Sequence, residues 1–126
     1  MDPEPVAVLI VDDQAPFRAA ARTVIGVTPG FEVVAEADSG EAAVAEAKTS
    51  SPGLVLMDIN LPGINGIEAT REIVAAAPET VVILLSTYNA GDLPADATTC
   101  GAAAYLHKED LFPDEVQRIW AAHLDS

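Results

Sequence analysis

Four short apolar runs, each of which ends abruptly in a polar side chain, constrain the fold of this chain more than any other feature. An uninterrupted apolar run indicates a strand buried on both faces, and such strands occur in parallel sheets covered by helices. The carboxyl ends of parallel strands meet at one edge, so we expect the polar residues to gather there, with Asp58 at the centre. The runs are residues 6–11, 54–57, 81–85 and 103–107, and they are followed by Asp12–Asp13, Asp58, Ser86 and Lys108.

Helical patterns and turn signals separate these runs. Residues 31–37 alternate in polarity, which predicts a further strand nearer the sheet edge. Apolar spacing and prolines predict helices over residues 15–27, 38–49 and 65–77, and a last helix that begins at Pro113. Asp38-Ser39-Gly40-Glu41 resembles a capping box for the second of these helices, and Asn65, with Glu68 three residues on, is predicted to cap the third. Five strands that alternate with helices predict an α/β fold with one parallel sheet covered on both faces. The periodicity does not by itself predict the order of the strands.

The segment 89–99 falls where a fourth helix is due, but its composition opposes one. Gly91, Pro94 and two threonines are poor helix formers. We therefore predict a helix that is short, late-starting or irregular. A regular helix of three turns that begins at Ala90 would contradict this prediction.

The composition predicts one acidic domain. A chain of 126 residues fits a single core, expected over residues 6–124 behind a disordered tail of residues 1–5. The 20 acidic and 6 basic residues give a net charge of −14, which argues against nucleic acid or an anionic membrane as a direct partner. No secretory signal or run of about 18 apolar residues is found, so a cytoplasmic location is expected. The single cysteine, Cys100, is interpreted as a packing residue.

The ordered set of polar motifs resembles the receiver domain of two-component response regulators. It combines Asp12-Asp13, the stretch Asp58-Ile59-Asn60-Leu61-Pro62-Gly63, Ser86, and Gly101-Ala102-Ala103-Ala104-Tyr105-Leu106-His107-Lys108. Each motif alone is weak, whereas the ordered set is specific and extends from Val6 to about His123. The resemblance implies a flavodoxin-like, doubly wound sheet of five parallel strands in the order 2-1-3-4-5, with five helices.

The resemblance also implies a metal site. Asp13, Asp58 and the backbone carbonyl of Asn60 would ligate Mg²⁺, and Asp12 would act mainly through water. Mg²⁺ takes oxygen ligands and relieves the repulsion between crowded carboxylates. The residues alone leave three acids as candidate nucleophiles, and the family pattern assigns the phosphoacceptor to Asp58.

Three further residues receive roles from the family pattern. Ser86 would turn inward to bond the phosphoryl group, and Tyr105 would follow it as a switch residue. Lys108 starts two strands from Asp58, about 10 Å away, a gap that its side chain together with a phosphoryl group would close. The output surface is expected to differ from the family norm, because the segment 89–99 contributes to it.

The favoured function is a phosphorylation-dependent switch rather than an enzyme with a separate substrate. The partners would be a sensor histidine kinase or phosphotransfer protein and an unknown downstream protein, with a homodimer left open. The ending of the motif, Tyr-Leu-x-Lys-Glu-Asp, favours a receiver from a regulator with a helix-turn-helix output domain over a stand-alone regulator. One alternative is a Mg²⁺-dependent phosphohydrolase with an aspartyl nucleophile, although Asn60 stands where its second acid would be. Another is a constitutive protein-binding domain with a vestigial site.

Several residues also have ordinary structural interpretations. Asp12-Asp13 is compatible with a helix-capping turn, and Tyr105 with core packing. Three positions depart from the family pattern: Ser86 replaces a commoner threonine, His107 an aliphatic residue, and Glu109 the proline found in many receivers. None of these changes removes a catalytic group. His107 and His123 are assigned no chemistry.

Overall fold

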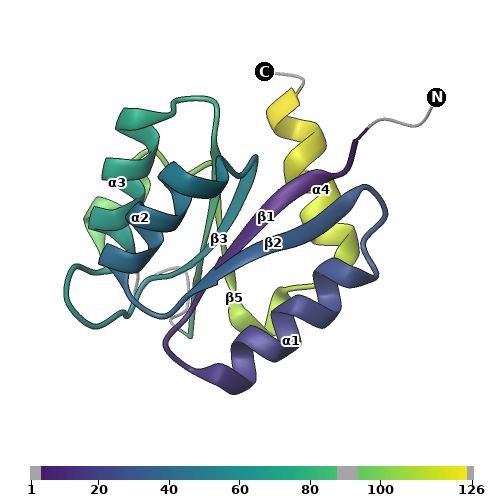
Figure 1. The fold of residues 1–126 in the computed structure, drawn as a ribbon, viewed down its shortest axis with the longest axis horizontal. Coiled ribbons are helices and arrows are strands. Elements are labelled where there is room, and N and C mark those ends of the chain that lie inside the picture. The colour runs from purple at the N-terminus through teal and green to yellow at the C-terminus, as the bar shows by residue number, and fades with distance from the viewer. Residues whose placement is uncertain (1–3, 88–93, 125–126) are drawn as a thin grey trace.

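A single parallel sheet forms the centre of the molecule (Figure 1). The computed structural model describes residues 4–87 and 94–124, so part of the predicted tail, residues 1–3, lies outside it. The strands follow the order β2-β1-β3-β4-β5, and every neighbouring pair is parallel, as predicted. They are β1 (Val6–Val11), β2 (Phe31–Ala37), β3 (Leu54–Asp58), β4 (Val81–Ser86) and β5 (Ala104–His107).

The described residues contain four α-helices, where the sequence predicted five helices. They are α1 (Ala15–Gly26), α2 (Gly40–Ser50), α3 (Gly66–Ala76) and α4 (Pro113–Leu124). Two short 3-10 helices are η2 (Ala95–Thr98) and η3 (Lys108–Asp110). Between β4 and β5 the described part of the chain thus holds only η2, which agrees with a short, irregular fourth helix. Residues 88–93, including the Ala90 position, lie outside the description.

Local sequence signals explain where the helices begin. The Ser39 hydroxyl accepts a hydrogen bond from the Ala42 N–H at 3.1 Å, and the Asn65 side chain accepts one from the Glu68 N–H at 2.9 Å. Such caps satisfy N–H groups that have no partner within the helix. The predicted Asn65 cap of α3 is therefore present, whereas α2 begins with a Ser39 cap instead of the predicted capping box, because the Glu41 carboxylate binds the Ile64 N–H.

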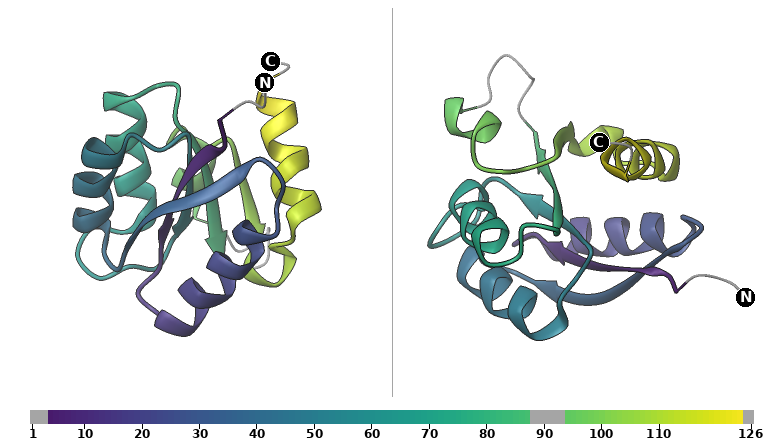
Figure 2. Two further views of the ribbon diagram at one scale, coloured as in Figure 1. Left: turned by 45° about the vertical axis from the view of Figure 1, so that its right-hand side comes forward. Right: turned by 90° about the horizontal axis from the view of Figure 1, so that it is seen from above.

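Helices cover both faces of the sheet, α2 and α3 on one side and α1 and α4 on the other (Figure 2). Successive residues of a strand point to opposite faces, which divides the core in two. In β1, Leu9 and Val11 pack under α2 and α3, whereas Val8 and Ile10 pack under α1 and α4. Cys100 is buried in the first of these clusters, as a packing residue should be. No helix in the described ranges is long and apolar enough to cross a membrane.

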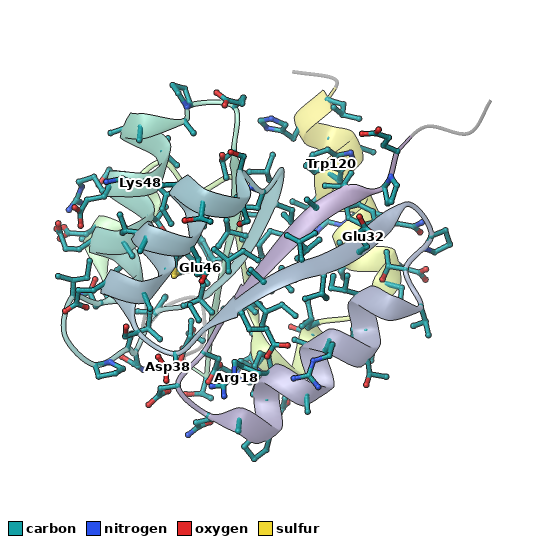
Figure 3. All side chains as sticks on the ribbon, viewed as in Figure 1. Arg18, Glu32, Asp38, Glu46, Lys48 and Trp120 are labelled. Atoms are coloured by element: carbon teal, nitrogen blue, oxygen red, sulfur yellow. The ribbon has the colours of Figure 1, made fainter. Side chains whose placement is uncertain are left out.

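The parallel topology places all five carboxyl ends on one edge of the sheet. In Figure 3, Arg18 and Asp38 lie at this end of the molecule, and Glu32 and Trp120 lie toward the opposite end. Trp120 packs edge-on against Phe31, with 5.8 Å between the ring centroids, and so belongs to the packing at that opposite end. The polar residues that follow the strands therefore lie at the edge marked by Arg18 and Asp38.

Candidate functional site

Three carboxylates from two neighbouring strands meet at this edge. Asp12 and Asp13 follow β1, and Asp58 ends β3, the central strand. One oxygen from each carboxylate lies within 4.8 Å of the other two. Asp12 and Asp58 are buried, whereas Asp13 is exposed. The predicted convergence of the acidic residues is thus present in the structure.

Lys108 joins this cluster directly. Its ammonium lies 2.6 Å from Asp12 Oδ2 and 3.5 Å from Asp58 Oδ2. The same ammonium lies over the Phe17 ring, 4.5 Å from its centroid. The lysine side chain therefore reaches Asp58 without an intervening phosphoryl group, contrary to the sequence expectation. The Phe17 ring, which belongs to α1, and the Asp12 carboxylate both attract the ammonium toward Asp58.

Burial makes the charge of Asp58 unfavourable. Removal from water, together with the negative charge of Asp12, raises the pKa of Asp58 from 3.8 to about 6. The Lys108 ammonium opposes this shift, and so does a hydrogen bond of 3.2 Å from the Asn60 N–H to Asp58 Oδ1. Asp13 adds a smaller repulsion. An additional cation at this position would relieve a repulsion that Lys108 leaves incompletely compensated.

The other predicted site residues differ in their burial and in their distance along the sheet from Asp58. Ser86 is buried at the end of β4, the strand next to Asp58. Asn60 is exposed in the loop after β3. Tyr105 is on β5 and is 40% exposed, which is not the burial of a core residue. Ser86 thus lies on the strand beside Asp58, and Tyr105 is partly exposed on β5, the next strand.

Sequence reasoning missed a group of contacts that hold the acidic turn. Arg18 donates a hydrogen bond of 2.6 Å to the backbone carbonyl of Asp12 and lies 3.4 Å from a Glu36 carboxylate oxygen on β2. Arg22 binds the same glutamate through two nitrogens, at 2.7 and 3.0 Å. The available signal was position, because Arg18 follows Asp12 by six residues and lies in the first turn of the next element, α1.

The loop after Asp58 is held by α2 and α3. Glu41 accepts a hydrogen bond from the Ile64 N–H at 3.1 Å, so the acid of the predicted capping box binds this loop. Its carboxylate also fills the space that a side chain at Gly63 would need. Gly66 at the start of α3 packs directly on the Asp58 carbonyl, where an added Cβ would lie 2.0 Å from the oxygen. These contacts fix the backbone that carries Asp58 and Asn60.

The residues present fit a hard divalent cation. Three carboxylates offer oxygen ligands at short mutual distances, and the exposure of Asp13 leaves access for water. Mg²⁺ prefers such oxygen ligands and retains several waters. The donor set is therefore suitable for Mg²⁺, and Lys108 supplies a fixed positive charge beside it.

Comparison with known proteins supports a family assignment. The family model described as the response regulator receiver domain matches residues 8–118. The response regulator UvrY of Escherichia coli K12 is 41% identical over 111 residues, which are 88% of this chain and 50% of UvrY. The transcriptional regulatory protein DegU of Brevibacillus brevis is 36% identical over 104 residues, 82% of this chain and 44% of DegU. The chain thus spans about half the length of these curated relatives.

Solved structures show the same fold. The chain matches a LuxR-family response regulator of Aurantimonas sp. SI85-9A1 with a TM-score of 0.84 and 32% identity, covering 97% of this chain and 87% of the other. It matches the signal receiver domain of the response regulator NarL of Mycobacterium tuberculosis with a TM-score of 0.82 and 32% identity, covering 98% and 96%. By sequence, fold and strand order, the chain belongs to the response regulator receiver domain family.

Proposed function

We propose that this chain is a phosphorylation-dependent signalling switch that accepts a phosphoryl group on Asp58. The supporting observation is the location of Asp58, which ends the central strand between the Asp12–Asp13 pair and β4 and lies 3.5 Å from the Lys108 ammonium. The donor would be the phosphohistidine of a sensor kinase or of a phosphotransfer protein. Such a kinase acts in the cytoplasm, where we therefore place this protein.

The chemistry is a displacement at phosphorus. An oxygen of Asp58 attacks the phosphorus atom, the bond from phosphorus to the histidine nitrogen breaks, and the imidazole leaves with the electron pair. The product is an acyl phosphate, which water later hydrolyses. Lys108 would neutralise charge on the phosphoryl oxygens, and the Ser86 hydroxyl would donate a hydrogen bond to one of them. The Lys108 ammonium now lies 2.6 Å from Asp12 Oδ2, and it would move away from this oxygen when it binds the phosphoryl group.

A metal completes the proposed site. Asp13, Asp58 and the backbone carbonyl of Asn60 would hold Mg²⁺, with Asp12 acting through water. Bound Mg²⁺ supplies positive charge that offsets repulsion between the carboxylates and the phosphoryl oxygens. The close approach of the three carboxylates and the raised pKa of Asp58 support this assignment.

The output of the switch would be a changed surface around β5 and α4. When Ser86 turns toward the phosphoryl group, Tyr105 would change its rotamer. The 40% exposure of Tyr105 supports the proposal, because a partly exposed side chain can move without opening the core. Because η2 has only four residues, we expect the output surface beside β5 to differ from that of other receivers, which have a regular helix there.

Phosphorylation by a small donor tests the proposal. Incubation with acetyl phosphate and Mg²⁺ should add one phosphoryl mass to the wild type and none to Asp58→Asn. The exposed Asp38, on the loop between β2 and α2, supplies a matched control, since Asp38→Asn should be modified like the wild type. A wild type that stays unmodified with acetyl phosphate would favour a constitutive protein-binding domain, and steady turnover of phosphate esters would favour a phosphohydrolase.

The relatives suggest where the signal goes. UvrY is named a response regulator and DegU a transcriptional regulatory protein, and each is about twice as long as the matched region. We propose that this receiver likewise controls an output function in gene regulation, through an unknown downstream protein or domain, with a homodimer as one form. The net charge of −14 makes direct DNA binding by the receiver itself unfavourable.

A further inference from the structure

His107 makes two hydrogen bonds to backbone groups on separate segments. Its Nε2 lies 3.1 Å from the Thr87 carbonyl oxygen, just beyond the end of β4. Its Nδ1 accepts a hydrogen bond of 3.1 Å from the Glu109 N–H and so caps η3. The side chain therefore links the residue after Ser86 to the segment that carries Lys108.

The two partners specify one form of the imidazole. The Glu109 N–H can only donate, so Nδ1 must carry a lone pair. The Thr87 carbonyl can only accept, so Nε2 must carry the proton. The neutral Nε2–H tautomer satisfies both bonds at once. An aliphatic residue, which the family pattern has at this position, would form neither bond.

The position of His107 connects it to the proposed chemistry. It is the register partner of Ser86 across the β4 and β5 pair, and it directly precedes Lys108. Ser86 and Lys108 are the two groups that would contact the phosphoryl group from this side of Asp58. The His107 side chain thus links the backbone beside Ser86 to the backbone beside Lys108. It does so at the end of β5, a strand of only four residues.

We propose that His107 is a positioning residue, which holds the Ser86–Thr87 end of β4 and the Lys108 segment in the relative placement that phosphorylation of Asp58 requires. This inference rests on the proposed function of Asp58. The bond from Nε2 to the Thr87 carbonyl is the essential one, because it spans the two segments. The bond to Nδ1 acts within a single segment.

Three substitutions separate the two bonds. In His107→Gln the side-chain amide can donate to the Thr87 carbonyl, as Nε2–H does. In His107→Asn the shorter amide oxygen can accept from the Glu109 N–H, as Nδ1 does. His107→Leu removes both bonds and keeps the bulk. His123→Gln, on α4 beside Trp120, is the matched control that should leave phosphorylation unchanged.

The rate of phosphorylation of Asp58 by acetyl phosphate with Mg²⁺ tests the proposal, with phosphoprotein followed by mass. One neutral hydrogen bond corresponds to a rate change of about two- to tenfold. We expect His107→Leu and His107→Asn to lower the rate at saturating donor by this factor. We expect His107→Gln to retain most of the wild-type rate. In all three variants the half-saturating concentration of acetyl phosphate and the affinity for Mg²⁺ should equal those of the wild type. Nitrogen NMR of the wild type should show the Nε2–H tautomer.

The outcomes distinguish this inference from the proposed function. If the wild type takes up a phosphoryl group and His107→Leu does so at the same rate, the positioning role is wrong and the function of Asp58 stands. Equal losses in the Gln, Asn and Leu variants would also overturn the role of the Thr87 bond. If the wild type is not modified at all, the proposed function fails, and the positioning role fails with it.

Discussion

At the scale of single residues, Asp58 is held in an environment that disfavours its charge. The carboxylate is buried beside Asp12, and the pKa of Asp58 is raised to about 6 as a result. Lys108 reduces this penalty without removing it. The Asp58 carboxylate therefore lowers the stability of the metal-free fold at neutral pH, where it is charged.

The first prediction concerns pH and the Asp58→Asn variant without metal. The folded state keeps the Asp58 proton up to about pH 6, whereas the unfolded chain loses it near 3.8. The contribution of protonated Asp58 to the free energy of unfolding is thus fully present below pH 4 and is lost as the pH rises through about 6. Asp58→Asn should equal the wild type near pH 4 and exceed it by about 3 kcal/mol at pH 7.5. Urea unfolding with a chelator measures this difference, and a constant difference across the range would contradict the prediction.

The second prediction concerns Mg²⁺. The ligands of the proposed Mg²⁺ site converge only in the folded state, so Mg²⁺ at 100 times its Kd should raise the free energy of unfolding by about 2.7 kcal/mol. The proposed site uses ionised Asp58 as a ligand, so the gain should be larger at pH 8 than at pH 5. Asp13→Asn should remove most of the gain, and the exposed Asp38→Asn should retain it. Urea unfolding with and without MgCl₂ provides the measurement. A gain in Asp13→Asn as large as in the wild type would exclude the acidic cluster as the site.

At the scale of elements, the close approach of α3 to the end of β3 positions the site. Gly66 begins α3, and its N–H donates a hydrogen bond of 2.9 Å to the Ile59 carbonyl. A Cβ on Gly66 would lie 2.0 Å from the Asp58 carbonyl oxygen, which belongs to backbone and cannot turn away. The helix and the strand end are therefore one unit, in which a shift of α3 displaces Asp58.

The third prediction compares two glycine substitutions. Gly66→Ala should destabilise the fold by about 1–3 kcal/mol through overpacking, and should slow phosphorylation of Asp58. Gly26→Ala, at the end of α1, meets no atom within 4 Å and should be neutral or stabilising by up to about 1 kcal/mol. Thermal unfolding of the two variants checks this contrast. Similar stabilities would show that α3 moves aside without strain.

At the scale of the whole molecule, the net charge of −14 produces self-repulsion throughout the surface. Only six basic residues are available to compensate 20 acidic ones. Ion pairs such as the one between Arg22 and Glu36 are too few to balance this excess.

The fourth prediction follows from screening. Raising NaCl from 10 to 200 mM shortens the range of repulsion between surface carboxylates from about 30 Å to less than 10 Å. The urea midpoint of the metal-free protein should rise over this interval. KCl should act like NaCl, since the effect depends on ionic strength rather than on a bound ion. A falling midpoint would mean that ion pairs such as the one between Arg22 and Glu36 dominate the stability.

Much of the fold was predictable because its signals are local. The four apolar runs and the alternating segment 31–37 predicted five parallel strands, and the capping signals at residues 38–41 and at Asn65 predicted where two helices begin. The interruption by Pro94 and its neighbours predicted the loss of a regular fourth helix in the described residues. The family resemblance, rather than periodicity, predicted the strand order that the sheet has. Strand order depends on contacts distant in sequence, which a periodic pattern does not encode.

The sequence by itself determined which elements form and which acids lie at the edge where the strands end, since hydrophobic periodicity and chain direction act within each segment. Only the tertiary structure decided that Lys108 binds Asp12 as well as Asp58, and that Arg18 and His107 hold backbone carbonyls of other segments. The physical reason is that these contacts depend on distances of a few ångströms between segments far apart in the chain. Such distances follow from packing, and no local pattern records them.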